Sequence, residues 1–209
     1  LESFSSRKIL MVIYPHPDDE TMAAGGLLLA AKKAGFKTVV AILTKGEAGQ
    51  SHINLKGQTL KEVRLKELKQ AAKILGIDEL AIGEFFDGKL REQVKEWQPW
   101  VLGIIKKYQP SLVVTYDPSG MSGHPDHIVL SLKVKEIVTK LPIEKITKLF
   151  WTTAAGIVRE RRVNKKVIDF ILGNWKPTEK ETLKKVRKKA SEALETIISS
   201  GRERAMNLF

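Results

Sequence analysis

The chain has 209 residues, which suits one full-sized domain rather than two, and its 43% hydrophobic and 29% charged residues are typical of a globular protein. It has no cysteine and no apolar run of about 18 residues, which excludes disulfides and thiolate metal sites and predicts no membrane-spanning helix. Its first 14 residues lack the pattern of a secretory signal, so the cytoplasm is the expected location.

The net charge of +12 is concentrated in residues 133–209, which contribute +10 of it. Such asymmetry is found in proteins that contact nucleic acid or anionic lipid, and also in chains with a plain solvated surface. The lysines here are dispersed along helical repeats without interleaved aromatic residues, so we expect no nucleic-acid partner. Peripheral contact with a membrane and a homo-oligomer both stay open.

Short β-prone runs alternate along the chain with stretches of helical periodicity. Strands are predicted at 8–14, 37–44, 79–82, 111–116 and 148–152, and helices at 21–34, 60–75, from Pro99 in a first turn to Tyr108, and from within 124–127 to about 140. This alternation predicts an α/β fold, a Rossmann-like open and mostly parallel sheet with helices on both faces.

The C-terminal part of the chain is harder to interpret. A capping box at Thr178 and Glu181 precedes an apolar stripe that predicts one long helix, whereas residues 153–176 show no clear pattern. We expect a single domain over 1–209, with its core in 8–150 and a C-terminal segment, 153–209, that shapes the substrate site.

Two short segments hold three of the four histidines: Pro15-His-Pro-Asp-Asp-Glu20 and Gly123-His-Pro-Asp-His127. Each follows the carboxyl end of a predicted buried strand. In an open parallel sheet, ligands bind outside those ends, where the strand order reverses. If strands 8–14 and 111–116 are neighbours there, the two segments face each other across one crevice.

The residue types suit a hydrolytic metal site. Imidazole and carboxylate are the usual ligands of zinc where thiolate is absent, and three of them leave a place for water, whose pKa then falls to about 7. His16 and Asp19 are close enough to converge on one ion, and His127 would complete the set. An aspartate that does not bind the metal would take the proton, but spacing alone does not distinguish Asp18 from Asp19 in that role.

The neighbouring polar residues would assist such a reaction. His124 could stabilise the oxyanion of a tetrahedral intermediate, and Asp126 could hold the tautomer of His124 or of His127. Asp, Pro and His after a strand are also ordinary turn and capping residues. Two such clusters, both at strand ends, favour the metal site.

The two motifs, in this order and after these strands, resemble the LmbE-like or PIG-L family of N-acetylglucosaminyl deacetylases. The likeness extends over about residues 8–150, and its supporting pieces are Thr44-Lys-Gly-Glu-Ala-Gly49, Arg64-Leu-Lys-Glu-Leu68, Phe86-Asp-Gly88 and Tyr116-Asp-Pro118. The resemblance implies an LmbE-like fold and zinc-dependent removal of an acetyl group from an N-acetylglucosamine conjugate or a small chito-oligosaccharide.

The resemblance also implies a role for each matched residue. The metal ligands would be His16, Asp19 and His127, the general base and acid Asp18, the polarising group His124, and the substrate contacts Arg64 and Asp87. Glu47, in the loop after the second strand, is a further candidate for the substrate pocket. The bacterial thiol-pathway deacetylases of this family often have a tyrosine two residues before the first histidine of the second motif, where this chain has Ser122.

Arg64 and Asp87 also allow interpretations other than substrate contact. Arg64 lies at the edge of an apolar helical stripe, where an arginine either reaches water or binds an anion, and Asp87 before a glycine is also ordinary turn material.

Two other functions stay open. One is a metal-dependent amidase that cleaves a different amide. The other is a basic nucleic-acid-binding module without catalysis, which predicts salt-dependent affinity and no metal.

Overall fold

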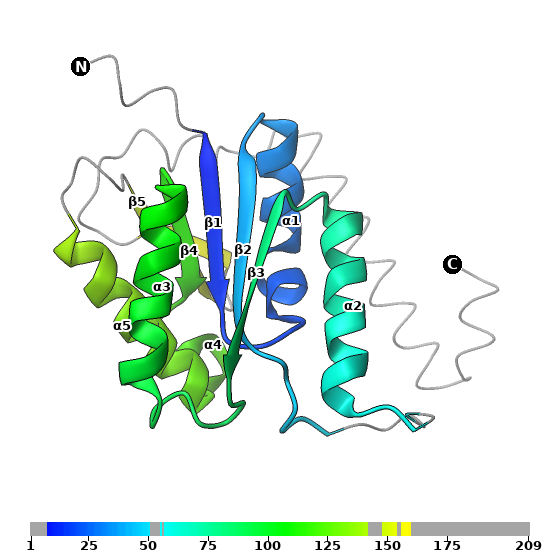
Figure 1. The fold of residues 1–209 in the computed structure, drawn as a ribbon. Coiled ribbons are helices and arrows are strands. Elements are labelled where there is room, and N and C mark those ends of the chain that lie inside the picture. The colour runs from blue at the N-terminus through cyan, green and yellow to red at the C-terminus, as the bar shows by residue number, and fades with distance from the viewer. Residues whose placement is uncertain (1–7, 51–54, 56, 142–147, 154–155, 160–209) are drawn as a thin grey trace, which may run out of the picture. The chain divides into compact units, whose positions relative to one another are not determined.

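The computed structural model describes residues 8–50, 55, 57–141, 148–153 and 156–159 (Figure 1). All of them belong to one compact unit, Leu1–Val163. The second unit, Asn164–Phe209, lies outside the described residues, and so does the helix predicted after Thr178. The expectation of one domain over 1–209 therefore stays a prediction.

The described strands form one sheet in the order β3-β2-β1-β4-β5-β6. The strands are β1 Ile9–Tyr14, β2 Lys37–Thr44, β3 Glu79–Phe85, β4 Leu112–Tyr116, β5 Lys148–Thr153 and β6 Gly156–Arg159. The first five are parallel, and β6 runs antiparallel to β5. The predicted α/β fold with a mostly parallel sheet is confirmed; β6 falls in the segment whose pattern predicted no element.

Helices cover both faces of the sheet (Figure 1). They are α1 Asp19–Lys33, α2 Leu60–Leu75, α3 Val94–Tyr108, the short α4 Gly120–Gly123 and α5 Pro125–Lys140. Met11 and Ile13 of β1 pack into a core cluster with α3 and α5. Right-handed crossovers put α1 and α2 on the other face of the sheet. Because successive side chains of a strand point to opposite faces, β1 is buried on both sides.

Helix α3 begins earlier than the sequence predicts. Pro99 was expected in its first turn, but the helix begins at Val94 and Pro99 lies inside it. Trp97 explains the difference: its side chain is fully buried, and its indole N–H donates to the carbonyl oxygen of Leu90 at 2.7 Å. The packing of this large side chain offsets the helical hydrogen bond that Pro99 lacks.

The strand order reverses between β1 and β4, which pair in parallel with Leu10 opposite Leu112. The expected neighbourhood of these two strands is confirmed. The two histidine segments therefore leave the sheet side by side, one between β1 and α1 and the other between β4 and α5. No helix in the described part of the chain is long and apolar enough to cross a membrane.

Candidate metal centre

The first histidine segment turns sharply from β1 into α1. The backbone N–H of His16 donates to Oδ2 of Asp19 at 2.9 Å, so both side chains are held on the same side of the turn. Asp18 lies between them as the N-cap of α1, with a φ of 98°. A non-glycine residue adopts such a φ at a cost of about 1–3 kcal/mol, which the surrounding contacts must offset.

The second histidine segment is shaped by α4 and the start of α5. His124 is the N-cap of α5, and its Nδ1 accepts the backbone N–H of Asp126 at 3.2 Å. His127 follows in the first turn, where its Nδ1 donates to the carbonyl oxygen of Gly120 at 3.1 Å. A Cβ on Gly120 would come within 2.9 Å of the His127 Cβ, so this close approach requires glycine.

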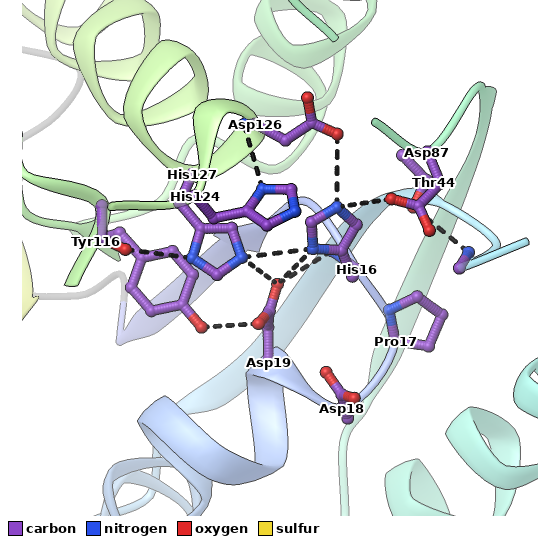
Figure 2. A network of polar contacts seen from close by, with 12 residues as sticks. His16, Pro17, Asp18, Asp19, Thr44, Asp87, Tyr116, His124, Asp126 and His127 are labelled. Carbon is purple, nitrogen blue, oxygen red and sulfur yellow. Dashed lines mark hydrogen bonds and ion pairs between the residues drawn. The ribbon is translucent and has the colours of Figure 1, made fainter. Parts of the chain in front are cut away.

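Three donor atoms from the two segments converge, as Figure 2 shows. The distance from His16 Nδ1 to His127 Nε2 is 3.2 Å, from His16 Nδ1 to Asp19 Oδ2 3.4 Å, and from His127 Nε2 to Asp19 Oδ2 3.7 Å. We call these three atoms the donor triangle. Ligands 2.0–2.2 Å from a tetrahedral ion are about 3.3–3.6 Å apart, which matches the triangle.

The hydrogen bonds around the donor triangle leave its nitrogens free to bind a cation. Because His127 Nδ1 donates to a carbonyl, its Nε2 carries a lone pair in the neutral ring. His16 Nε2 lies 2.9 Å from Asp87 Oδ1 and 3.3 Å from Asp126 Oδ2, two carboxylates that hold its proton there and leave Nδ1 for the triangle. Two lone pairs and a carboxylate oxygen that face one another need a shared proton or a cation between them.

The pKa values of the three side chains agree with a cation site. Burial lowers the pKa of His127, which favours its neutral form. Burial would raise the pKa of Asp19, but hydrogen bonding to His16 and to Tyr116 brings it below its usual value. For His16, burial lowers the pKa, but hydrogen bonds to Asp126, Asp19 and Asp87 outweigh it and raise the value to about 11. In the absence of a metal, a proton on His16 therefore balances the carboxylates, and a divalent ion would compete with that proton.

Two other groups among the described residues have a spacing compatible with an ion: His16 with His124 and His127, and His16 with Asp87 and Asp126. All of these groups share His16. In the last group, the Asp126 carboxylate already accepts the backbone N–H of Gly88 at 2.8 Å and of Leu90 at 3.2 Å. Asp126 is thus a partner of His16 and a link to the loop after β3, and the donor triangle is the group with free lone pairs.

Tyr116, the last residue of β4, was not among the predicted site residues. Its hydroxyl donates to Asp19 Oδ1 at 2.6 Å, and its ring stacks on His127 with centroids 4.3 Å apart and an interplanar angle of 8°. A tyrosine that ends a buried strand directly before the second histidine segment is a signal in the sequence that points to this role.

Residues 11–138, more than half of the chain, match the family model PIG-L, described as GlcNAc-PI de-N-acetylase. The chain belongs to the PIG-L family. The resemblance drawn from the two histidine motifs is thereby confirmed. A second family model, peptidyl-tRNA hydrolase, matches residues 134–209, most of which lie outside the described residues.

Several relatives carry descriptive names. The chain is 32% identical over 140 residues to the probable N-acetyl-α-D-glucosaminyl L-malate deacetylase 2 of Bacillus cereus, with 65% of this chain and 63% of the relative covered. It is 33% identical over 127 residues to diacetylchitobiose deacetylase of Thermococcus kodakarensis, covering 60% of this chain and 47% of the relative. The chain thus spans less than two thirds of these relatives.

Among solved structures, N,N'-diacetylchitobiose deacetylase from Pyrococcus horikoshii superposes with a TM-score of 0.63 at 24% identity, covering 81% of this chain and 69% of that one. At this identity the likeness shows the fold alone.

The family's two adjacent aspartates have separate places in this chain. Asp19 belongs to the donor triangle, whereas the side chain of Asp18 is 61% exposed and pairs with Arg64, whose Nη2 donates to Asp18 Oδ2 at 2.6 Å. Partial burial raises the pKa of Asp18 above its usual value, and the charge of Arg64 opposes that rise. Asp18 is therefore not part of the donor triangle, and its role as general base stays a prediction.

Arg64 of this PIG-L chain is expected to bind substrate, and the structure shows what else it holds. Besides Asp18, it donates to the carbonyl oxygen of Pro17 at 2.9 Å and to that of Gly46 at 3.1 Å. A Cβ on Gly46 would lie 2.3 Å from Arg64 Nη1, so only glycine lets the guanidinium approach. The arginine thus ties the loops after β1 and β2 together, and its contact with substrate stays a prediction.

The other expected residues also have internal partners. Asp87 accepts the backbone N–H of Ala48 at 3.1 Å, and its own N–H donates to Glu47 Oε1 at 2.9 Å, which joins the loops after β2 and β3. The side chain of Asp87 is only 8% exposed and contacts His16, so it supports a ligand of the centre. Substrate contact by Glu47 and Asp87 is not tested by these contacts.

Two expectations for the second segment can be compared directly with the structure. Asp126 was expected to hold the tautomer of His124 or His127. Its backbone N–H does donate to His124 Nδ1, whereas its carboxylate faces His16, because the backbone N–H groups of the loop after β3 fix it there. Ser122 is exposed, and its hydroxyl donates to the Gly120 carbonyl at 3.4 Å. It therefore does not replace the tyrosine hydroxyl expected at this position from the resemblance to the bacterial thiol-pathway deacetylases.

Proposed function

We propose that this PIG-L family chain is a zinc-dependent hydrolase that removes the acetyl group from an N-acetylglucosamine-containing substrate. The observation that carries the proposal is the donor triangle, together with a separate carboxylate, Asp18, that is next to Asp19 in the chain. The names of the two relatives, both deacetylases of acetylated glucosamine compounds, support the substrate class.

The donor set favours zinc. Two imidazole nitrogens and one carboxylate oxygen, without sulfur, form a three-ligand set typical of catalytic zinc. An ion held by His16, Asp19 and His127 would act as a Lewis acid and lower the pKa of water to about 7. The remaining chemistry belongs to the side chains around it.

Asp18 is the proposed proton carrier. Hydrolysis of the amide requires a base that takes a proton from the attacking water and an acid that gives one to the leaving nitrogen. Asp18 is exposed to a substrate and is held by Arg64, so one carboxyl group can accept the first proton and deliver it in the second step. The products are acetate and a free amine, and the proton count balances.

His124 is the proposed oxyanion donor. Because its Nδ1 accepts the Asp126 backbone N–H, the proton of the neutral ring is on Nε2. The ring lies next to the centre, with its centroid 4.9 Å from that of His16 and 4.8 Å from that of His127. An N–H at this place can donate to the developing oxyanion of the amide, which Ser122 is too short to do.

The experiment is an acetate-release screen with the zinc-loaded protein. The compounds are N-acetylglucosamine, its oligomers, and its malate and inositol conjugates, together with simple acetamides that contain no sugar. We expect zinc-dependent acetate release from at least one sugar compound, abolished by chelation and restored by zinc.

Each alternative has its own outcome in this screen. Release from acetamides without preference for the sugar would favour a general amidase. No release from any compound, combined with salt-dependent nucleic-acid binding, would replace the enzyme by a basic binding module.

A further inference from the structure

The two oxygens of Asp19 have separate partners. Oδ2 belongs to the donor triangle, at 3.4 Å from His16 Nδ1 and 3.7 Å from His127 Nε2. Oδ1 accepts the hydroxyl hydrogen of Tyr116 at 2.6 Å. A hydrogen bond this short, to an ionised carboxylate, is charge-assisted and about twice as strong as a neutral one. It directs the lone pairs of Oδ1 away from the triangle.

The same tyrosine also restrains the second ligand. Its ring stacks on the imidazole of His127, almost parallel to it, at a centroid distance of 4.3 Å. The hydrogen bond from His127 Nδ1 to Gly120 fixes one edge of the imidazole, and the stacking fixes its plane. Together they point His127 Nε2 toward the other two atoms of the donor triangle (Figure 2).

Tyr116 is itself held rigidly. It ends a buried strand, its side chain is 1% exposed, and its carbonyl oxygen accepts the hydroxyl of Ser131 at 2.7 Å. Its ring also packs against Tyr14 at 4.5 Å. A residue so enclosed does not reach a substrate, so its influence on the centre acts through Asp19 and His127.

We propose that Tyr116 is a positioning residue of the metal centre: its hydroxyl keeps Asp19 a one-oxygen ligand through Oδ2, and its ring fixes the plane of His127. The inference rests on the proposed metal site but not on the identity of the substrate. Partners of this kind orient metal ligands, and their loss typically weakens metal binding 10–100-fold.

The chain offers a matched control for the test. Tyr14 is also fully buried, and its hydroxyl has one partner, Thr152 Oγ1, at 2.7 Å. Tyr14→Phe and Tyr116→Phe therefore remove the same atom from adjacent rings, but only the second removes a contact with a ligand. Both variants keep the ring and its packing.

The measurements are zinc affinity by competition with a chromophoric chelator and the visible absorption spectrum of the cobalt(II)-loaded protein. Circular dichroism confirms beforehand that both variants are folded. We expect Tyr116→Phe to bind zinc about 10–100-fold more weakly and to shift the cobalt(II) bands, whereas Tyr14→Phe matches the wild type in both.

Equal zinc affinity of Tyr116→Phe and wild type would overturn the inference, and so would an equal loss in both variants, because that indicates a general packing effect. A crystal structure of the zinc-loaded wild type gives an independent check: Asp19 bound through both oxygens would contradict the proposal. A wild type that binds zinc but releases no acetate would contradict the deacetylase, not the role of Tyr116. A wild type that binds no zinc would overturn both.

Discussion

Replacing Gly46 by alanine perturbs the link between Arg64 and Asp18 without a substitution at either residue. The new Cβ would lie 2.3 Å from Nη1, 2.7 Å from Cζ and 2.9 Å from Cδ of Arg64, so the guanidinium must move. Gly46 also has a φ of 69°, where alanine is strained by about 1–2 kcal/mol. Gly35→Ala is the matched control, since Gly35 has a φ of 78° and nothing within 4 Å of its added Cβ.

The difference between the two variants measures the displacement of Arg64. Its hydrogen bond to the Gly46 carbonyl is worth about 1 kcal/mol, and its exposed pair with Asp18 about 0–1 kcal/mol. Gly46→Ala should therefore lose about 1–2 kcal/mol more unfolding free energy than Gly35→Ala. Because Asp18 is no longer held in place, kcat should also fall about 10- to 100-fold, whereas Gly35→Ala keeps the wild-type kcat.

Urea unfolding gives the two free energies, and acetate release on the best substrate of the screen gives kcat. If Gly46→Ala and Gly35→Ala agree in both quantities, Arg64 does not position Asp18, and the cost at Gly46 is backbone strain alone.

Three further outcomes are expected. Elemental analysis should find about one zinc per chain in the wild type and none in His127→Ala, whose donor nitrogen is gone; a fully active, metal-free protein would contradict the mechanism. Asp18→Asn should keep its zinc but lose about 10²–10⁴-fold in kcat, and a near-wild-type rate would place the base elsewhere. Burial alone would raise the pKa of Asp78, but hydrogen bonds from Lys32 at 2.6 Å and the Thr38 N–H at 2.7 Å lower it below its usual value. This carboxylate therefore stabilises the fold above its unfolded pKa, and the stabilisation is lost as pH falls through its pKa in the folded state. Asp78→Asn should thus cost about 1–2 kcal/mol of unfolding free energy at pH 7 and progressively less below about pH 4, and a cost independent of pH would refute the assignment.

The strand pattern correctly predicted that the two histidine motifs lie side by side. Both motifs follow buried strands, and a parallel sheet brings such strand ends together where its order reverses. The roles of the two adjacent aspartates did not follow from spacing. The two side chains lie in different places because the His16 N–H fixes Asp19, whereas Arg64, 46 residues away in sequence, holds Asp18.

The outer contacts of the centre depend on long-range packing that no local pattern contains. Asp126 faces His16 because the N–H groups of Gly88 and Leu90, from a separate loop, hold its carboxylate. Tyr116 lies in a segment that resembles the family, but only the pairing of β4 with β1 brings its hydroxyl to Asp19. Pro99 was placed too early in its helix because the burial of Trp97 is a tertiary effect.

The donor triangle joins His16 and His127, which are 111 residues apart in the chain. These side chains meet only after β1 and β4 have paired, so an ion that needs both has high affinity for the folded state and little for the unfolded one. At a free ion concentration of 100 times its dissociation constant, such selectivity stabilises the fold by about 2.7 kcal/mol. The folded state would then become more stable as the free metal concentration rises, so that metal starvation would remove both the proposed reaction and part of the protein's resistance to proteolysis.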